Sequence, residues 1–305
     1  MIITITFHPT IDKYFTVNEL LPNSKLHAQN IVLKSGGGGL NVSKVLAKQG
    51  LSSKAYVFSG GRNSSLLTSI LEQEIKYQRI NTECEIRENV IIQDTSNNQE
   101  YRFNMPISEL PESAYLQFLT TLQKEKTIKF LVLSGTLGEN FSSSFYQNLY
   151  QWALDSKIKL IIDTKGKNLK IIGDIGAYLI KPNKKEFNMI ASSKANTNEE
   201  IEVEAKKLLS YKKIENILVS LGKEGALLID NNETTLIPAP EVLMTNSVGA
   251  GDSLVAGVLF KLNEGIALKE AVQYGVLCAA ATAINKKKSI FEMDDLLQII
   301  ESRKN

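Results

Sequence analysis

The chain alternates between short apolar runs and longer stretches in which apolar residues recur at helical spacing. The runs at 129–134 and 158–163 are rich in Leu, Ile, Val and Phe, and they predict buried strands. Between them, Phe145, Leu149 and Trp152 fall on one face of a predicted helix and are expected to belong to the core. This order of strand, helix and strand is typical of βαβ crossovers and recurs along most of the chain. It predicts an α/β fold with a mostly parallel central sheet.

Two regions interrupt the alternation and predict a second, smaller sheet. Residues 13–34 contain strand-like stretches, and residues 87–105 have the pattern of a hairpin that turns at 96–98. Both are excursions from the α/β core, so we expect them to cover a site at the sheet edge or to pair with a second subunit. The chain shows no internal repeat or long linker. We therefore expect residues 1–305 to form a single domain that carries these two lid excursions.

Composition and charge narrow the classes of protein that fit. The 305 residues are 43% hydrophobic, which allows one large core. The 35 basic and 33 acidic residues give a net charge of +2, so we expect neither a nucleic-acid nor a membrane partner. The apolar run at 1–7 is too short for a signal or a membrane span and predicts a core strand. Cys84 and Cys278 lack disulfide or zinc-site spacing, and a reducing, cytoplasmic location is expected.

The segment 247–252, Ser-Val-Gly-Ala-Gly-Asp, leads into a predicted helix and carries the most informative chemistry. Backbone amides and the helix dipole at such a start can hold an anion, for example a transferring phosphoryl group. One reading gives Asp252 only the task of stabilising the helix start, which is worth about 0.3–1 kcal/mol. In the other, Asp252 is a general base, and the amides of Gly249, Ala250 and Gly251 stabilise the phosphoryl oxygens. The segment alone leaves both readings open.

Four consecutive glycines, Gly36–Gly39, separate a predicted strand from a predicted helix. Such a run costs considerable backbone entropy on folding. It is therefore expected where another group must approach the backbone closely. It does not fit the G-x-G-x-x-G fingerprint of dinucleotide sites, and the chain contains no Walker A sequence. We therefore interpret it as an acceptor site that complements Asp252. Asp12 follows the first strand and either accepts hydrogen bonds from a ligand or caps a turn, whereas His8 is expected to be a satisfied strand-end residue.

The segments 36–41 and 248–252 together resemble the paired signatures of the ribokinase-like PfkB carbohydrate kinases. Three further elements, at 10–12, 181–186 and 220–225, occur in the family's order, so the resemblance covers nearly the whole chain. It implies a three-layer α/β/α core with a small β-sheet lid. It also implies ATP as phosphoryl donor and Mg²⁺ as metal cofactor.

Within this family the chain is most similar to the branch that phosphorylates ketohexose phosphates. Lys25, Arg87 and Arg102 match the positions that bind the sugar phosphate in these enzymes. Each could equally be a surface charge, although the planar fork of Arg is well suited to phosphate. The resemblance also implies that Lys25 reaches the sugar phosphate of a neighbouring subunit. We therefore expect a homodimer that forms through the lid.

The resemblance assigns further residues to the sugar, the nucleotide and the metal. It places Asp12 and Asn41 on the sugar, and Gly37 and Gly38 beside the sugar ring. Around the nucleotide and magnesium it places Lys181, Asn183, Glu186, Ser220, Gly222 and Gly225, with Asn183 and Glu186 on the metal. An amide and a carboxylate one helical turn apart suit magnesium or its waters. Residues 285–289 depart from the family pattern, which leaves open whether a monovalent-cation site lies near the nucleotide.

We expect transfer of the γ-phosphoryl group of ATP to a primary hydroxyl of a ketohexose phosphate, with Asp252 as general base. Gly38 stands where 1-phosphofructokinases and tagatose-6-phosphate kinases often carry Lys, and the segment 101–106 also favours a 6-phosphate acceptor. Fructose 6-phosphate is expected slightly before tagatose 6-phosphate. Two alternatives stay open, namely a 1-phosphofructokinase acting on fructose 1-phosphate and a catalytically silent sugar-phosphate sensor. A dinucleotide-dependent oxidoreductase is disfavoured because its fingerprint is missing.

Overall fold

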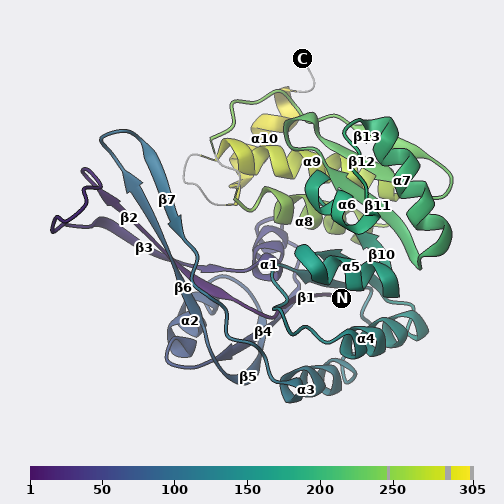
Figure 1. Ribbon diagram of the computed structural model, residues 1–305, viewed down its shortest axis with the longest axis horizontal. Coiled ribbons are helices and arrows are strands. Elements are labelled where there is room, and N and C mark those ends of the chain that lie inside the picture. The colour runs from purple at the N-terminus through teal and green to yellow at the C-terminus, as the bar shows by residue number, and fades with distance from the viewer. Residues whose placement is uncertain (246–247, 286–289, 303–305) are drawn as a thin grey trace.

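The computed structural model describes residues 1–245, 248–285 and 290–302 and consists of a large helix-covered sheet with a small projecting sheet (Figure 1). Strands and helices alternate along most of the chain, as the apolar pattern predicts. In chain order, the elements are β1 (Ile2–Thr6), β2 (Thr10–Val17), β3 (Gln29–Gly36), α1 (Gly38–Lys48), β4 (Lys54–Gly60), α2 (Ser64–Leu71), β5 (Tyr77–Glu85), β6 (Arg87–Asp94), β7 (Gln99–Phe103), α3 (Glu112–Leu122), β8 (Phe130–Ser134), α4 (Ser143–Asp155), β9 (Lys159–Asp163), α5 (Gly166–Ile175), β10 (Ala177–Ile180), α6 (Lys184–Ala191), α7 (Asn198–Tyr211), β11 (Ile214–Ser220), the 3₁₀ helix η1 (Gly222–Glu224), β12 (Ala226–Ile229), β13 (Thr234–Ile237), α8 (Ala250–Asn263), α9 (Leu268–Ile284) and α10 (Met293–Ser302).

The large sheet has the strand order β13-β12-β11-β10-β9-β8-β1-β4-β5. Neighbouring strands from β11 to β5 run parallel, whereas β12 and β13 are antiparallel at one edge. The apolar runs predicted as strands are β8 and β9, which lie side by side with Phe130 opposite Lys159. Since parallel neighbours need crossover connections, the helices between them are forced onto the sheet faces.

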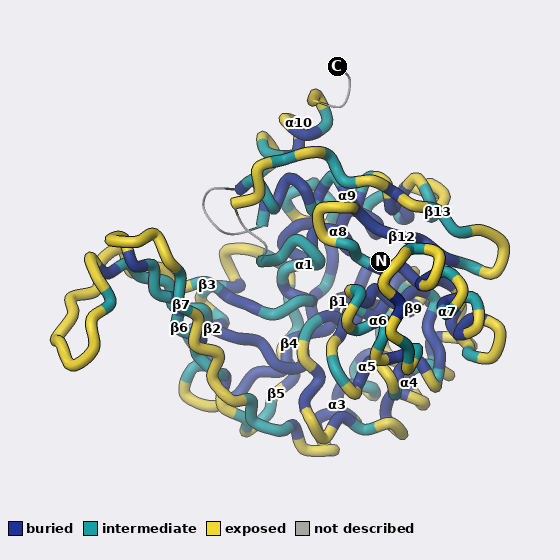
Figure 2. Tube along the Cα trace, turned by 45° about the horizontal axis from the view of Figure 1, so that its top comes forward, coloured by how far each residue is buried: buried dark blue, intermediate teal, exposed yellow. Residues whose placement is uncertain are grey.

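Helices cover both faces of the large sheet, which gives the molecule three layers. Helices α3 to α7 pack on one face, and α1, α8, α9 and α10 pack on the other. Along β1, Ile3 and Ile5 belong to the first core and Ile2 to the second, so the strand is buried on both sides (Figure 2). In α4, Phe145 and Leu149 are fully buried, but Trp152 lies at the edge of the core and is only partly buried.

The small sheet is built from the two predicted excursions and has the order β3-β2-β6-β7. Strands β2 and β6 run parallel, and each also has an antiparallel partner, β3 and β7 respectively. The hairpin of β6 and β7 turns between Asp94 and Gln99, at the predicted place. The sheet projects from the body of the molecule in Figure 1. The predicted fold class is thus confirmed, while the single-domain organisation stays a prediction.

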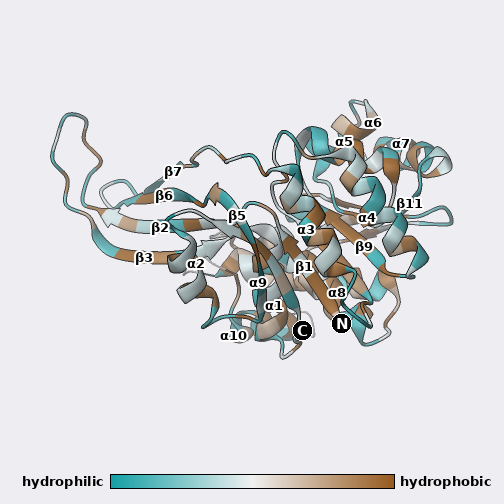
Figure 3. Cartoon of the chain, turned by 90° about the horizontal axis from the view of Figure 1, so that it is seen from below, coloured by the Kyte–Doolittle hydropathy of each residue, from teal (hydrophilic) through white to brown (hydrophobic). Residues whose placement is uncertain are grey.

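The two faces of the small sheet differ in character because side chains alternate along each strand. Asp12 pairs with Lys34 on one side and Asn89 on the other, which makes one face polar. On the opposite face Leu33 and Phe103 are exposed. Figure 3 shows this mixture of hydrophilic and hydrophobic positions along the strands. Among the described helices, none combines the length and apolar character that crossing a membrane requires.

Candidate active site

Asp252 lies in the first turn of α8, as the sequence predicts. The helix is capped by Gly249 in the left-handed conformation with φ 79°, which glycine adopts without strain. The carboxylate accepts two hydrogen bonds, from Asn41 Nδ2 at 2.8 Å and from Ser134 Oγ at 3.2 Å. Asn41 belongs to the first turns of α1, and Ser134 ends β8. Three distant segments of the chain therefore meet at one carboxylate.

A buried ion pair lies beside Asp252. Lys181 Nζ is 3.0 Å from Asp163 Oδ1, and the lysine side chain is only 6% exposed. Burial lowers the pKa of Lys181, but the charge and hydrogen bond of Asp163 outweigh it and hold that pKa above its ordinary value. Asp163 ends β9, next to Ser134 at the end of β8, so adjacent parallel strands deliver both side chains to one edge.

This environment raises the pKa of Asp252 from 3.8 to about 6. Burial is the largest cause, and the negative charge of Asp163 adds to it. The hydrogen bond from Asn41, the charge of Lys181 and the hydrogen bond from Ser134 act in the opposite direction. A carboxylate with a pKa near 6 is largely ionised at neutral pH and is still basic enough to take a proton from a hydroxyl.

The glycine-rich segments allow close contacts between these elements. The strand β3 ends at Gly36 and α1 begins at Gly38, so only Gly37 separates them. A Cβ at Gly38 would lie 2.7 Å from Gly135 N and would also collide with Ser134 Oγ. Glycine is therefore required for α1 to start directly against the end of β8. The predicted approach of a sugar ring to Gly37 and Gly38 stays a prediction.

Ala250 and Gly251 form the first residues of α8. A Cβ at Gly251 would lie 3.1 Å from Lys181 Nζ, which shows how closely the helix start approaches the buried lysine. Lys181, expected beside the nucleotide, thus lies directly under the predicted anion loop. The positive charge of Lys181, the start of α8 and Asp252 therefore occupy one small region.

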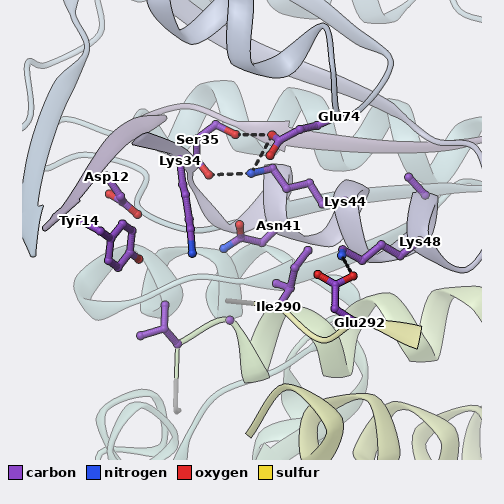
Figure 4. Close-up of a pocket in the computed structure, with 13 residues that line it drawn as sticks. Asp12, Tyr14, Lys34, Ser35, Asn41, Lys44, Lys48, Glu74, Ile290 and Glu292 are labelled. Atoms are coloured by element: carbon purple, nitrogen blue, oxygen red, sulfur yellow. Dashed lines mark hydrogen bonds and ion pairs between the residues drawn. The ribbon is translucent and has the colours of Figure 1, made fainter. Parts of the chain in front are cut away.

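A cavity of about 490 Å³ opens between α1, the small sheet and the segment before α8 (Figure 4). Its lining combines polar side chains from the small sheet with residues of α1 and of the segments around 248 and 290, namely Asp12, Tyr14, Lys34, Ser35, Asn41, Lys44, Ala47, Lys48, Glu74, Val248, Gly249, Ile290 and Glu292. Asp12 Oδ1 accepts hydrogen bonds from Thr10 Oγ1 at 2.9 Å and Asn89 Nδ2 at 2.8 Å. The predicted sugar-side residues Asp12 and Asn41 therefore line one cavity.

Two of the predicted nucleotide-side residues, Asn183 and Ser220, line a second cavity of about 400 Å³. These two residues also form an isolated parallel bridge with each other. Gly222 begins the 3₁₀ helix η1 that follows β11, and Gly225 ends it. A Cβ at Gly225 would lie 2.6 Å from Ala239 N and would strike the carbonyl oxygen of Ile237, so this turn is tightly packed.

Asn183 and Glu186 form a reciprocal capping box at the start of α6. Asn183 Oδ1 accepts a hydrogen bond from Glu186 N at 3.0 Å, and Glu186 Oε2 accepts one from Asn183 N at 2.8 Å. The spacing of this pair therefore has a structural cause, and its contact with magnesium stays a prediction. Within residues 1–245, 248–285 and 290–302 there is no cluster of three or more His, Cys, Asp or Glu side chains that could hold a metal ion.

The three predicted phosphate-binding cations are placed differently from one another. Lys25 lies in the exposed connection between β2 and β3, at the end of the small sheet far from the main sheet (Figure 1). Arg87 starts β6 and donates a hydrogen bond to Met105 O at 3.1 Å. Arg102 in β7 is ion-paired with Glu100 at 2.5 Å. Arg87 and Arg102 share the polar face with Asp12, whereas Lys25 is not among the residues that line the cavity.

Sequence reasoning missed Ser134, Asp163 and Lys34. Ser134 and Asp163 are the last residues of the apolar runs at 129–134 and 158–163, and ligands bind beyond the carboxyl ends of parallel strands. That rule would have selected both. Lys34 gave a weaker signal, because its inward orientation depends on the register between β3 and β2.

The prediction that His8 is a satisfied residue is wrong for one of its ring nitrogens. Nε2 of His8 is buried and has no hydrogen-bond partner in the described part of the chain. Burial lowers the pKa of this imidazole, so it stays neutral. Ser247, at the start of the 247–252 motif, lies outside the described residues, as do positions 286–289 of the departure from the family pattern at 285–289.

The acid limb of the pH profile should report the ionisation of Asp252. Because a general base works only when charged, we expect kcat/KM to rise with pH through about 6 and to fall below it. Ser134→Ala removes a hydrogen bond that favours the carboxylate, so it should move this limb to higher pH. Steady-state profiles of the parent and Ser134→Ala check this. A phosphate group on the substrate titrates at about 6 as well, but its limb would not move in the variant.

A buried carboxylate at a helix N-terminus with a buried lysine beside it suits an enzyme that transfers a phosphoryl group to a hydroxyl. The chain matches the model of the pfkB family of carbohydrate kinases over residues 6–294 and belongs to this family. It is therefore a sugar kinase, a phosphotransferase with an alcohol group as acceptor, and the family implies ATP as phosphoryl donor.

Relatives and solved structures match over almost the whole chain. ATP-dependent 6-phosphofructokinase isozyme 2 of Escherichia coli (strain K12) is 29% identical over 98% of this chain and 97% of its own length. The 1-phosphofructokinase of Borreliella burgdorferi is 28% identical over 98% and 96% respectively. The structure of phosphofructokinase-2 from Escherichia coli in complex with fructose-6-phosphate has a TM-score of 0.90 at 28% identity, and the match covers 100% of this chain and 99% of that one.

Proposed function

We propose that the protein transfers the γ-phosphoryl group of ATP to a ketohexose phosphate and produces the bisphosphate, with Asp252 as general base. The observation that carries the proposal is the position of Asp252, which lies at the start of α8 and is hydrogen-bonded to Asn41 beside the first cavity. A hydroxyl bound next to Asn41 has a basic carboxylate within reach. A phosphoryl group at the helix start has backbone amides within reach.

In the proposed mechanism, one set of residues binds the acceptor and takes its proton, and a second set stabilises the phosphoryl group that is transferred. Asp12 and Asn41 bind hydroxyl groups of the acceptor in the first cavity, and Asp252 takes the proton of the attacking hydroxyl. The amides from Gly249 to Asp252 donate hydrogen bonds to the phosphoryl oxygens, where negative charge accumulates. Lys181, held by Asp163, adds a positive charge close to the same place. These residues lower the energy of the transition state by positioning the reacting groups and by stabilising their charge.

Magnesium fits the nucleotide side of this site. Mg²⁺ prefers oxygen ligands, keeps several waters and binds through one or two carboxylates together with substrate phosphates. Glu186 supplies a carboxylate and Asn183 an amide oxygen, but the capping box already uses the single side-chain oxygen of Asn183 and one of the two carboxylate oxygens of Glu186. These two residues would therefore hold the ion mainly through its waters. When bound there, the ion would neutralise charge on the phosphates of the nucleotide.

For the acceptor we favour a 6-phosphate, with fructose 6-phosphate before tagatose 6-phosphate. Gly38 and the segment 101–106 support this choice, as does the similarity to the Escherichia coli enzyme whose structure contains fructose-6-phosphate. Fructose 1-phosphate is the competing acceptor, because the 1-phosphofructokinase of Borreliella burgdorferi is almost equally similar in sequence. Overall identity therefore does not decide the acceptor, and a kinetic comparison is needed.

A homodimer that forms through the small sheet is part of the proposal. The face opposite Asp12 exposes Leu33 and Phe103, which are 37% and 48% accessible, and exposed apolar side chains on a sheet favour association. Lys25 lies at the outer end of the same sheet, where a neighbouring subunit would bring a second cavity to it. Sedimentation of the purified protein tests this association.

The acceptor assay is the direct test of the function. Purified protein is incubated with ATP and magnesium against fructose 6-phosphate, tagatose 6-phosphate and fructose 1-phosphate, and kcat/KM is compared because it measures discrimination in the transition state. We expect turnover with a 6-phosphate to exceed turnover with the 1-phosphate. Turnover of an unphosphorylated sugar or nucleoside, with none of the three phosphates reacting, would show that the proposed acceptor class is wrong.

A further inference from the structure

Asn89 lies directly beside Asp12 in the small sheet. The two residues are opposite each other in the parallel pair of β2 and β6, and Asn89 Nδ2 donates a hydrogen bond of 2.8 Å to Asp12 Oδ1. Asp12 lines the first cavity together with Asn41 (Figure 4). Asn89 is only 9% exposed and is not among the residues that line this cavity. It can therefore influence a molecule in the cavity through the carboxylate of Asp12, without touching that molecule.

The side-chain amide of Asn89 has one fixed orientation. Its Oδ1 accepts a hydrogen bond from Met105 N at 3.3 Å. Because a backbone N–H can only donate and a carboxylate can only accept, the amide oxygen has to face Met105 and the amide nitrogen has to face Asp12. Arg87 Nη1 donates a hydrogen bond of 3.1 Å to Met105 O, so both backbone groups of Met105 are held. Asn89 thus joins Asp12 to the segment that also holds Arg87.

Two donors hold one oxygen of the Asp12 carboxylate. Both hydrogen bonds that Asp12 accepts within the described part of the chain reach Oδ1, one from Asn89 and one from Thr10 Oγ1 at 2.9 Å. The terminal torsion of an aspartate is soft, so these two bonds select one orientation of the carboxylate. Oδ2 then lies beside the glycine run, since a Cβ at Gly36 would be only 2.6 Å from it. Oδ2 is the oxygen that is left for a hydroxyl group of the acceptor.

We propose that Asn89 is a positioning residue for the acceptor, because it holds Asp12 so that Oδ2 meets a sugar hydroxyl beside the glycine run. This inference rests on the proposed function, in which Asp12 binds the sugar. A carboxylate that is already held in its binding orientation loses less freedom when the acceptor binds. Through Met105, the same amide also fixes the segment that accepts a hydrogen bond from Arg87, a second expected contact of the acceptor.

Asn89→Asp separates the two hydrogen bonds of this amide. The new carboxylate is nearly the same size and can still accept from Met105 N, but it cannot donate to Asp12 and repels it. At about pH 8, where both carboxyl groups are ionised, we expect the KM for the ketohexose phosphate to rise at least about tenfold. The KM for ATP should stay within about twofold of the parent. Asn89→Ala adds no charge and should raise the acceptor KM by less than Asn89→Asp does.

The Asp12→Ala background tests whether Asn89 acts through Asp12. Asp12→Ala alone should raise the acceptor KM, because a ligand of the sugar is lost. Asn89→Ala added to it should change that KM by less than about twofold, since the carboxylate that Asn89 holds is absent. An unchanged acceptor KM in Asp12→Ala, or fully additive effects of the two substitutions, overturns the proposal.

Asn63→Asp is the matched control. Asn63 Nδ2 also donates a hydrogen bond to a carboxylate, Glu88 Oε1 at 3.0 Å, but Asn63 lines neither cavity. This variant should leave both KM values within about twofold of the parent. Melting curves establish that each variant is folded, and if Asn89→Asp does not fold, Asn89→Ala and its dependence on Asp12 carry the test.

Two results separate the role of Asn89 from the proposed function. A folded Asn89→Asp with the acceptor KM of the parent, or with equal rises in both KM values, means that Asn89 does not position the acceptor. If the parent turns over none of the ketohexose phosphates, the proposed function itself fails. The two failures are distinguishable, because the first is observed while the parent turns over its acceptor.

Discussion

Asp252→Asn is expected to lower kcat by about 10²–10⁴-fold while ATP still binds. The amide is nearly the same size as the carboxylate and can still accept the hydrogen bond from Asn41, but it cannot take a proton from the attacking hydroxyl. The loss should therefore appear in turnover rather than in nucleotide affinity. Steady-state kinetics and calorimetric titration with ATP measure the two quantities separately.

Asp294→Asn is the matched control for this variant. Asp294 also lies in the first turn of a helix, α10, but is exposed and outside both cavities. If Asp252 only stabilised a helix start, the two variants would have similar, small effects on kcat.

The folded protein binds the proton of Asp252 more tightly than the unfolded chain, so ionisation between about pH 4 and 6 costs stability. Asp252→Asn should thus be at least as stable at pH 7, and near-parental turnover in it would contradict the assignment.

Lys181→Met is expected to lower the free energy of unfolding by about 3–5 kcal/mol. Lys181 is nearly fully buried, and its removal leaves the carboxylate of Asp163 largely buried without its partner. The variant should also raise the pKa of Asp252, because a positive charge that favours the carboxylate is lost. The acid limb of the activity profile would then move to higher pH. Urea denaturation measures the stability, and the pH profile measures the second effect.

A surface ion pair provides the comparison for this variant. Lys207 pairs with Glu204 at 2.7 Å on an exposed face of α7, and Lys207→Met should change the stability by no more than about 0.5 kcal/mol. Combining Lys181→Met with Asp163→Asn removes both charges and should recover part of the lost stability, because the uncompensated charge is gone. Equal losses in the free energy of unfolding for Lys181→Met and Lys207→Met would mean that the buried ion pair contributes no more to stability than the surface pair does.

The fold was largely predictable because each strand and helix has its own pattern of apolar residues in the sequence. Each apolar run is long enough for one strand, and the helices between runs show a clear apolar face, so β8, α4 and β9 follow from the sequence. The position of Asp252 in a first helical turn followed from the glycines before it. Strand order was not accessible in this way, since it depends on packing between segments far apart in the chain.

The site was predictable only where the family motifs cover it. Asn41 and Asp252 belong to motifs, and their direct hydrogen bond agrees with a shared site. Ser134 and Asp163 lie outside these motifs and become visible only when β8 and β9 are known to be neighbours. The inward orientation of Lys34 requires the register of β3 against β2. The spacing of Asn183 and Glu186 suggested a metal, but the same spacing serves a capping box. Local spacing cannot separate these two roles.

The parallel pairing of β2 with β6 has a consequence for how the protein folds. Thr10 lies opposite Arg87, and most of the intervening chain belongs to elements of the main body. Neither hairpin of the small sheet can therefore bring these two strands together by local closure. The entropy of closing so long a loop is offset only after the main sheet has formed around β1 and β4. We therefore expect the small sheet to assemble late, and its amides to gain protection from hydrogen exchange after those of the central strands.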